Sequence, residues 1–278
     1  PMGAPLKPEF LEILREVFSE EEARLATFMK FTLQSSGEIA KQCETESKEV
    51  YNRLENMANK GVIYCSKRSG ESRYALLPPM PGIFEFTLTR GERNEKTDKL
   101  GKLWDRYFMN GLGQVMHNTA VPLSRVLPVG KALPDQVDVL SYERASEIIR
   151  NAWNIGLASC QCRFSSQNCQ APLDVCLILN SWADFLNDRQ LTRPISKDEA
   201  LAALDRAEEA GLVHCTNNTK GQVPFICNCC SCCCNMLRGV TRLNFPRSLA
   251  SSSYLARVEE KDCLCDSLCT SRCHFKAI

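Results

Sequence analysis

The sequence predicts an α+β fold. Apolar residues recur at helical spacing in several segments, short β-like runs lie between them, and no strict β–α–β repeat connects the two kinds. Fifteen of the 17 cysteines lie after residue 159, so composition changes sharply along the 278 residues. We therefore expect three parts: residues 1–80, a cysteine-rich α+β domain over 81–245, and a short C-terminal segment over 246–278.

The first part is predicted to be helical and to end in a β-hairpin. Ser19, followed by three glutamates, is a typical helix start, because a serine side chain caps the helix and negative charge suits its N-terminus. Gly61 is a typical helix stop. The expected order is helix 8–18, helix 20–31, helix 37–42, helix 45–60 and then β runs over 62–66 and 72–77.

Residues 8–78 resemble a winged helix-turn-helix, in which three helices precede a hairpin. That resemblance implies DNA binding through the helix at residues 46–59. Its charges argue against this function, since glutamates offset the basic residues and the whole chain carries a net charge of only +1. We expect a winged-helix-like domain used for docking or homodimer contacts, and no nucleic-acid partner.

The middle part is predicted to mix helices and strands. Ser196 and Glu199 form a capping-box pattern at the start of one helix. The expected elements are helix 95–116, a helix from Ser141 to Trp153, strand 155–159, helix 173–188, helix 197–210, strand 212–216 and an apolar run over 223–226.

Ten cysteines of the middle part form two groups. The first is Cys160, Cys162, Cys169 and Cys176, and the second is Cys227, Cys229, Cys230, Cys232, Cys233 and Cys234. Free thiols at this density would oxidise, and a disulfide framework is typical of short secreted chains, so metal-bound thiolates are the prediction. Disulfides and unliganded thiols remain the alternatives.

The second group cannot face one metal if the chain is extended there. Alternation would then put Cys230, Cys232 and Cys234 on one side and the other three on the opposite side. This pattern favours ligands for two clusters. His214 and Cys215 are further candidates because they lie nearby in the sequence.

The C-terminal segment resembles a ferredoxin half-site, Cys-x2-Cys-x2-Cys-x3-Cys-Pro. Cys263, Cys269 and Cys273 occupy the first, third and fourth positions, and Asp266 occupies the second. Cys265 stands one residue early and a histidine replaces the proline. Four interpretations stay open: a carboxylate ligand, a shifted Cys265, a three-iron cluster or zinc. The segment is either incomplete or lends Cys273 to another site.

Four runs around the middle cysteines resemble 4Fe–4S ferredoxin-domain proteins of anaerobic bacteria and archaea that have a winged-helix-like N-terminal region. These runs are residues 158–163, 174–177, 208–214 and 226–234. The resemblance implies one to three [4Fe–4S] clusters and electron transfer. Arg163, Lys220 and Arg238 are predicted to lie near the clusters and to tune their potential.

The expected function is therefore electron transfer to or from a redox partner protein. The alternatives are a redox- or metal-sensing winged-helix transcription regulator, a reductase with an open iron site and a zinc-binding scaffold. We find no Ser-His-Asp set and no nucleotide-binding loop, so a stand-alone enzyme is not expected. No secretory signal and no run of about 20 apolar residues is present, which predicts a cytoplasmic protein without a membrane span.

Overall fold

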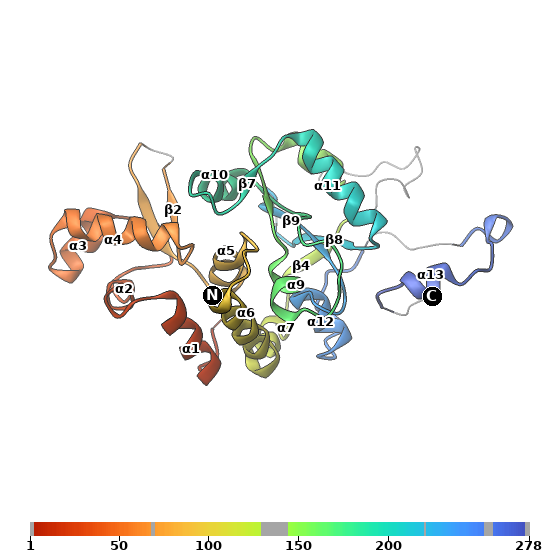
Figure 1. Ribbon diagram of the computed structural model, residues 1–278, viewed down its shortest axis with the longest axis horizontal. Coiled ribbons are helices and arrows are strands. Elements are labelled where there is room, and N and C mark those ends of the chain that lie inside the picture. Colours follow the sequence, from red (N-terminus) through yellow and green to blue (C-terminus); the bar gives the residue numbers. More distant parts are fainter. Residues whose placement is uncertain (1–2, 68–69, 129–143, 220, 253–257, 276–278) are drawn as a thin grey trace.

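The computed structural model describes residues 3–67, 70–128, 144–219, 221–252 and 258–275. Within these residues, helices alternate along the chain with the strands of two antiparallel sheets (Figure 1). The prediction of a fold that mixes helices and strands is thus confirmed. Among the described helices, none combines the length and the apolar character needed to cross a bilayer.

The N-terminal part contains four helices and a small antiparallel sheet of order β1-β3-β2. Ser19 is the predicted N-cap of the second helix, where it forms a capping box with Glu22, although that helix ends at Ala26 rather than near residue 31. The elements are α1 (Pro8–Val17), α2 (Glu20–Ala26), β1 (Gln34–Ser35), α3 (Ser36–Cys43), α4 (Ser47–Asn59), β2 (Ile63–Ser66) and β3 (Arg73–Leu76).

The long helix predicted over residues 95–116 is interrupted. After the short helix α5 (Phe84–Leu88), α6 runs over Glu95–Tyr107 and α7 over Gly113–His117, with an irregular turn at Phe108–Leu112 between them. Gly111 in that turn has a non-helical backbone. The prediction was wrong here because a glycine lowers the cost of leaving the helix.

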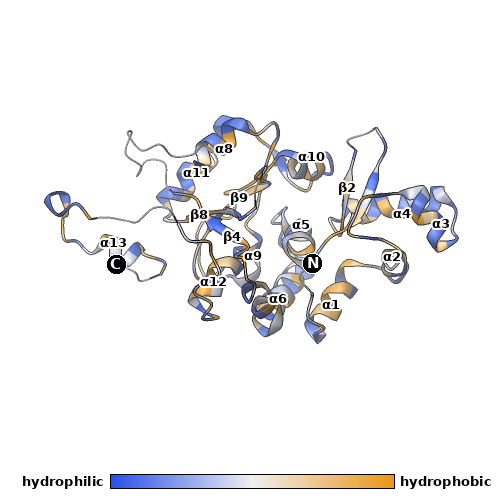
Figure 2. Ribbon diagram, turned by 180° about the vertical axis from the view of Figure 1, so that it is seen from behind, coloured by the Kyte–Doolittle hydropathy of each residue, from blue (hydrophilic) through white to orange (hydrophobic). Residues whose placement is uncertain are grey.

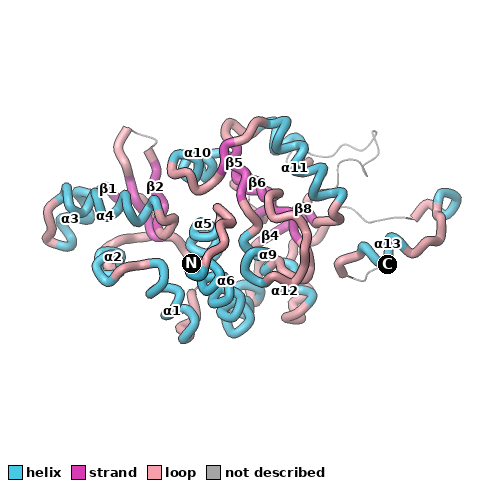
Figure 3. Tube along the Cα trace, in the orientation of Figure 1, coloured by secondary structure: helices cyan, strands magenta, loops and turns pink. Residues whose placement is uncertain are grey.

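The larger sheet has six strands in the order β4-β8-β9-β6-β5-β7, and every pairing between them is antiparallel. Figure 3 shows these strands at the centre of the molecule with helices around them. The strands are β4 (Ser124–Val126), β5 (Ile155–Ala158), β6 (Cys176–Leu179), β7 (Arg193–Pro194), β8 (Val213–Asn217) and β9 (Phe225–Cys229).

The two faces of this sheet have separate cores. Leu177, Leu179 and Ile226 pack in one core with residues of α8 (Ala145–Asn151) and α11 (Lys197–Glu209). The opposite face carries the side chains that alternate with these and joins a core continuous with the N-terminal helices. Figure 2 shows hydrophilic and hydrophobic residues along both α4 and α11, as expected for helices with one buried face.

The helix predicted over residues 173–188 was wrong in its first part. Cys176–Leu179 forms β6, which pairs with β5 on one side and β9 on the other, and only Asn180–Asp188 forms the helix α10. All four residues of β6 are buried. A short, fully apolar run of this kind has the same periodicity in a central strand as in a buried helix, and strand pairing decided the outcome.

Candidate metal centre

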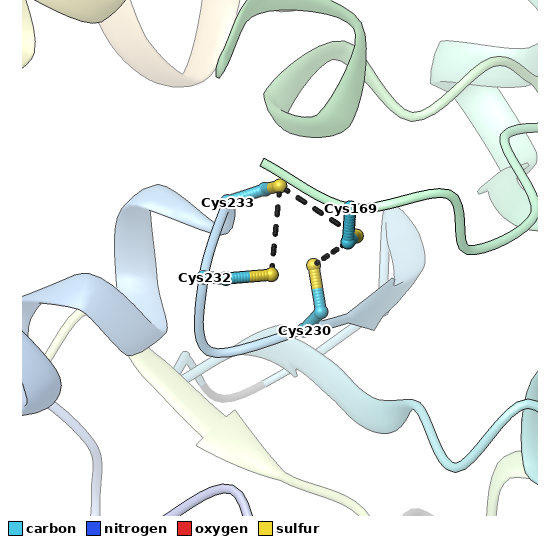
Figure 4. A group of neighbouring side chains, drawn as sticks. All are labelled: Cys169, Cys230, Cys232 and Cys233. Atoms are coloured by element: carbon cyan, nitrogen blue, oxygen red, sulfur yellow. Dashed lines mark hydrogen bonds between the residues drawn. The ribbon is translucent and has the colours of Figure 1, made fainter. Parts of the chain in front are cut away.

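Four cysteine sulfurs converge beside the end of β9. The Sγ atoms of Cys169, Cys230, Cys232 and Cys233 all lie within 4.8 Å of one another. The Sγ of Cys169 is 3.7 Å from that of Cys230 and 3.8 Å from that of Cys233, and the sulfurs of Cys232 and Cys233 are 3.7 Å apart. Figure 4 shows the four side chains pointing toward one another. We call this set the four-thiol group, and it could hold a metal ion.

Two loops bring the four-thiol group together. The turn that follows β9 leads into α12 (Asn235–Thr241), and Thr241 Oγ1 donates a hydrogen bond of 3.1 Å to the carbonyl of Ser231. The loop after α9 (Gln161–Ser166) carries Cys169, and Asn168 Nδ2 in this loop donates to the carbonyl of Cys232 at 2.9 Å. These bonds hold each loop in place without using the thiols.

The spacing of the sulfurs fits a single ion. A zinc–sulfur bond of about 2.3 Å in a tetrahedral site places the sulfurs about 3.8 Å apart, which is close to the three measured contacts. In a cubane each cysteine ligates a different iron, so the four sulfurs stand further apart. A tetrahedral set of four sulfurs is typical of zinc or iron.

Arg163 lies directly against the four-thiol group. Its side chain is almost fully buried, at 2% exposure, and its Nη1 lies 2.8 Å from the carbonyl oxygen of Asn228 and 3.9 Å from Cys230 Sγ. Its Nη2 donates to the carbonyl of Pro172. Among the described residues Arg163 forms no ion pair with a carboxylate, and its Nε has no partner. A buried cation of this kind requires nearby negative charge, which metal-bound thiolates would provide.

The same environment acts on the thiols of the group. Hydrogen bonding from Cys233 and from the guanidinium of Arg163 lowers the pKa of Cys230 well below its usual value, against the effect of burial. A thiolate is the form that binds a metal. The site therefore favours the ligand form of at least one cysteine before any metal arrives.

Seven further thiols gather on one face of the large sheet. They are Cys160, Cys162, Cys176, Cys215, Cys227, Cys229 and Cys234, and all are buried or half-buried. Every one of these is a free thiol. We call them the seven-thiol group. The cysteines are therefore grouped differently in space than in the sequence. Cys169 is separated from the first predicted group, and Cys215 joins the seven-thiol group.

The expected alternation along residues 227–234 was wrong. Cys233 belongs to the four-thiol group together with Cys230 and Cys232, whereas Cys234 interacts with Cys162. The chain is extended only as far as Cys229, and a turn follows. The period of two holds only in the strand, so it does not apply beyond that residue.

Cys215 joins the thiols through strand pairing. It lies opposite Cys227 in the β8–β9 hairpin, whereas its neighbour His214 pairs with Asn228 and points to the other face. His214 Nδ1 lies 2.5 Å from Asn228 Oδ1. The register of the β8–β9 hairpin, had it been inferred from the turn in the sequence, would have identified Cys215 rather than His214 as the residue on the same face as Cys227.

Burial and contacts between the thiols raise the pKa of every member of the seven-thiol group. The hydrogen bond with Cys176, together with burial, raises the pKa of Cys160 well above its usual value. The pKa of Cys162 is raised in the same way by Cys234 and by burial. Buried neutral thiols are inert, so a metal that displaces their protons is the chemistry that suits them.

The C-terminal cysteines form a less compact set. Cys263 Sγ lies 3.9 Å from Cys265 Sγ, and both residues are exposed together with Cys269, while Cys273 is half-buried. Asp266 Oδ1 accepts a hydrogen bond of 3.0 Å from the amide of Leu268, at the start of α13 (Leu268–Arg272). The ferredoxin half-site of Cys263, Asp266, Cys269 and Cys273 stays a prediction.

The other two predicted tuning residues differ in their surroundings. Arg238 is buried in α12 and its Nη2 forms an ion pair with Asp105 at 2.8 Å, so its charge is already balanced. Lys220 lies outside the described residues. Of the three predicted cations, Arg163 is the one that contacts a cysteine sulfur in the described part of the chain.

Comparisons of the chain with family models, with curated proteins and with solved structures found no match. The geometry of the thiols and of Arg163 is therefore the basis of the functional argument.

Proposed function

We propose that the chain is an iron–sulfur protein that transfers electrons to or from a partner oxidoreductase. One observation carries this proposal: Arg163, a buried arginine without a carboxylate partner among the described residues, contacts Cys230 of the four-thiol group and interacts electrostatically with Cys160 and Cys176 of the seven-thiol group. Thiolates that bind metal would balance the charge of Arg163. A positive charge beside a redox centre also stabilises the electron that the centre gains on reduction.

The residues of the chain have defined tasks in this proposal. The cysteines of the two groups would hold iron, and bound iron–sulfur clusters supply one-electron redox chemistry. Burial of the thiols keeps water from the site, and Arg163 favours the more negative, reduced state through its charge. Such a protein needs a donor and an acceptor, and we assign that role to a redox partner protein.

Zinc binding is a second candidate, favoured by one specific observation. The sulfur separations of 3.7 and 3.8 Å in the four-thiol group equal those of a tetrahedral zinc site. A zinc ion there would stabilise the two loops without redox chemistry. Metal analysis distinguishes this candidate, because zinc alone, with no sulfide in the protein, excludes electron transfer by these thiols.

A winged-helix regulator is less well supported. The order of α3, α4, β2 and β3 agrees with that interpretation. In α4, however, Arg53 is paired with Glu21 and Glu49 within the chain. Glu55 of the same helix forms an ion pair of 3.1 Å with Arg189 at the end of α10. Arg53, Glu49 and Glu55 of the helix that would read DNA are thus engaged within the chain, which supports a docking role for the N-terminal part.

A redox titration tests electron transfer directly. The full chain, purified without air, is reduced stepwise and followed by electron paramagnetic resonance. We expect a signal from a reduced cluster that appears with one-electron behaviour and disappears on reoxidation. A protein that takes up no electrons and shows no signal at any potential would contradict the proposal.

A further inference from the structure

We infer that the chain holds two metal centres of different kinds, one on each side of Arg163. The four-thiol group binds a single zinc or iron ion, and the seven-thiol group binds a polynuclear iron–sulfur cluster. This inference rests on the proposed function and adds to it the division of the cysteines and the nuclearity of each centre.

Strand register places three of the seven thiols in a row. Cys215 lies opposite Cys227 in the β8–β9 pair. The pairing of Leu177 with Ile226 between β6 and β9 then places Cys176 beside Cys227 on its other side. Directly opposed residues share a face of the sheet, and adjacent strands are about 4.8 Å apart. The three sulfurs therefore rise from neighbouring strands on one face.

Four more thiols complete this group around the row. Cys229 follows Cys227 at a spacing of two residues in β9, so it shares the same face. Cys160 and Cys234 immediately precede α9 and α12, and Cys162 lies in α9. Neighbouring thiols of this group also shift one another's pKa, which links Cys160 with Cys176, Cys176 with Cys227, Cys227 with Cys229, Cys229 with Cys215 and Cys234, and Cys234 with Cys162.

The two groups differ in how closely their sulfurs approach. Within the described part of the chain, the four-thiol group is the one set in which three or more ligand atoms all lie within 4.8 Å of one another. The seven-thiol group is connected pair by pair but has no such compact core. A single ion needs a compact set of four ligands, whereas a cluster with several irons needs thiolates that are spread around it.

Arg163 interacts with thiols of both groups. Its Nη1 reaches Cys230 of the four-thiol group at 3.9 Å, and its charge also acts on Cys160 and Cys176 of the seven-thiol group. One buried cation therefore faces thiols from both sets. Two anionic centres placed close together repel each other, and a positive charge between them reduces that repulsion.

Buried polar atoms on α9 point to the same conclusion. Gln161 Nε2 and Arg163 Nε are buried and have no hydrogen-bond partner among the described residues. Buried donors are normally paired, so each unpaired donor requires an explanation. The sulfurs of a cluster bound next to α9 would accept such hydrogen bonds, which tune cluster potentials in proteins of this kind.

The test compares one variant from each group in the full chain purified without air. Cys227→Ser alters the seven-thiol group, Cys233→Ser alters the four-thiol group, and Cys43→Ser is the matched control in the N-terminal part. Iron, zinc and acid-labile sulfide are counted per chain. We expect Cys227→Ser to lose about four sulfides with their iron. We expect Cys233→Ser to lose one metal ion with its sulfide content unchanged, and the control to match the parent chain.

Each outcome decides between these ideas. Sulfide that is lost equally from both variants, or from neither, while present in the parent chain would overturn the two-centre inference and leave the proposed function standing. A parent chain without iron and sulfide would overturn both. X-ray absorption of Cys227→Ser, which should lack the cluster, tests the remaining centre: sulfur neighbours at about 2.3 Å without a neighbouring metal support the single-ion centre, and a neighbouring metal contradicts it.

Discussion

Arg163 and Cys230 are in contact, with Nη1 of the arginine 3.9 Å from Sγ of the cysteine. The same Nη1 donates a hydrogen bond of 2.8 Å to the backbone carbonyl of Asn228, which fixes the guanidinium at the end of β9. A charged group held in this way lies at a constant distance from the thiols. The electrostatics of the site therefore depend on one side chain.

Replacing Arg163 by glutamine should lower the reduction potential of the nearby centre. Reduction adds negative charge, and the buried guanidinium stabilises that charge, so its loss makes reduction harder by roughly 50 mV. Potentiometric titration of Arg163→Gln and of the parent chain measures this difference. A potential that does not move, in a variant that retains its metal, would show that Arg163 has only a structural task.

Arg189→Gln is the matched control for that experiment. Arg189 is also a buried arginine, but its partner is Glu55 of α4. We expect this variant to lose stability because it leaves Glu55 without its ion pair, and to keep the potential of the parent chain.

Replacing Cys169 by serine should remove the metal-dependent part of the stability. Cys169 is the member of the four-thiol group that comes from the α9–β6 loop, so its loss removes the link that a bound metal would form between the two loops. We expect a decrease of at least about 3 kcal/mol in the free energy of unfolding, because metal binding energy contributes to folding. Thermal unfolding with and without a chelator measures it.

The chelator provides the decisive comparison. The parent chain and Cys43→Ser should both be destabilised by the chelator, whereas Cys169→Ser, which already lacks the ion of the four-thiol group, should be destabilised less. An equal response of all three proteins would mean that the four-thiol group holds no metal.

The carboxyl group of Glu85 should make the stability of the folded chain depend on pH. This residue in α5 accepts a hydrogen bond of 2.6 Å from the amide of Gly82, and burial raises the pKa of its carboxyl group to about 7. The folded chain therefore keeps a proton that the unfolded chain has lost between pH 4.5 and 7, and stability falls as the pH rises through this window.

The variant Glu85→Gln resembles the protonated carboxyl group. It should be more stable than the parent chain by up to about 3 kcal/mol at pH 8, and this advantage should shrink toward pH 5. Denaturant unfolding at both pH values tests this, with the exposed Glu71→Gln as control. An advantage that is independent of pH would disprove the assignment.

His274 should hold the C-terminal segment against the metal-binding loop. Its Nε2 donates to the carbonyl of Gly211 at 2.7 Å, which leaves Nδ1 to accept from the hydroxyl of Ser231 at 3.2 Å. Two lost hydrogen bonds of about 1 kcal/mol each would open this contact roughly thirtyfold more often. We expect His274→Ala to increase the rate of tryptic cleavage after Arg272.

Ser271→Ala is the control for this prediction, because the Ser271 hydroxyl donates a hydrogen bond within its own helix, to the carbonyl of Leu268. Mass spectrometry of the cleaved products gives the rate at each site. Equal rates in the two variants would show that His274 does not hold the segment in place.

Local signals in the sequence predicted much of the secondary structure. The N-cap at Ser19 and the capping box at Ser196 were confirmed because they depend on residues only three positions apart. The concentration of cysteines also predicted a thiol site in the middle part, and the group of Cys169, Cys230, Cys232 and Cys233 confirms that a metal ion could be held there.

The division of the cysteines could not be predicted from spacing. It depends on where β9 ends, and the turn after Cys229 is stabilised by the bond from Thr241 to Ser231, ten residues apart. Cys169 reaches the group through Asn168, which bonds to a residue 64 positions away. Contacts of this range are set by tertiary packing. For the same reason β6 was mistaken for a helix.

The most direct test is elemental analysis of the unaltered chain, expressed and purified without air. Our account predicts iron with about four acid-labile sulfides per chain or more, together with one further thiolate-bound zinc or iron ion. A folded protein that contains neither iron nor sulfide would contradict it.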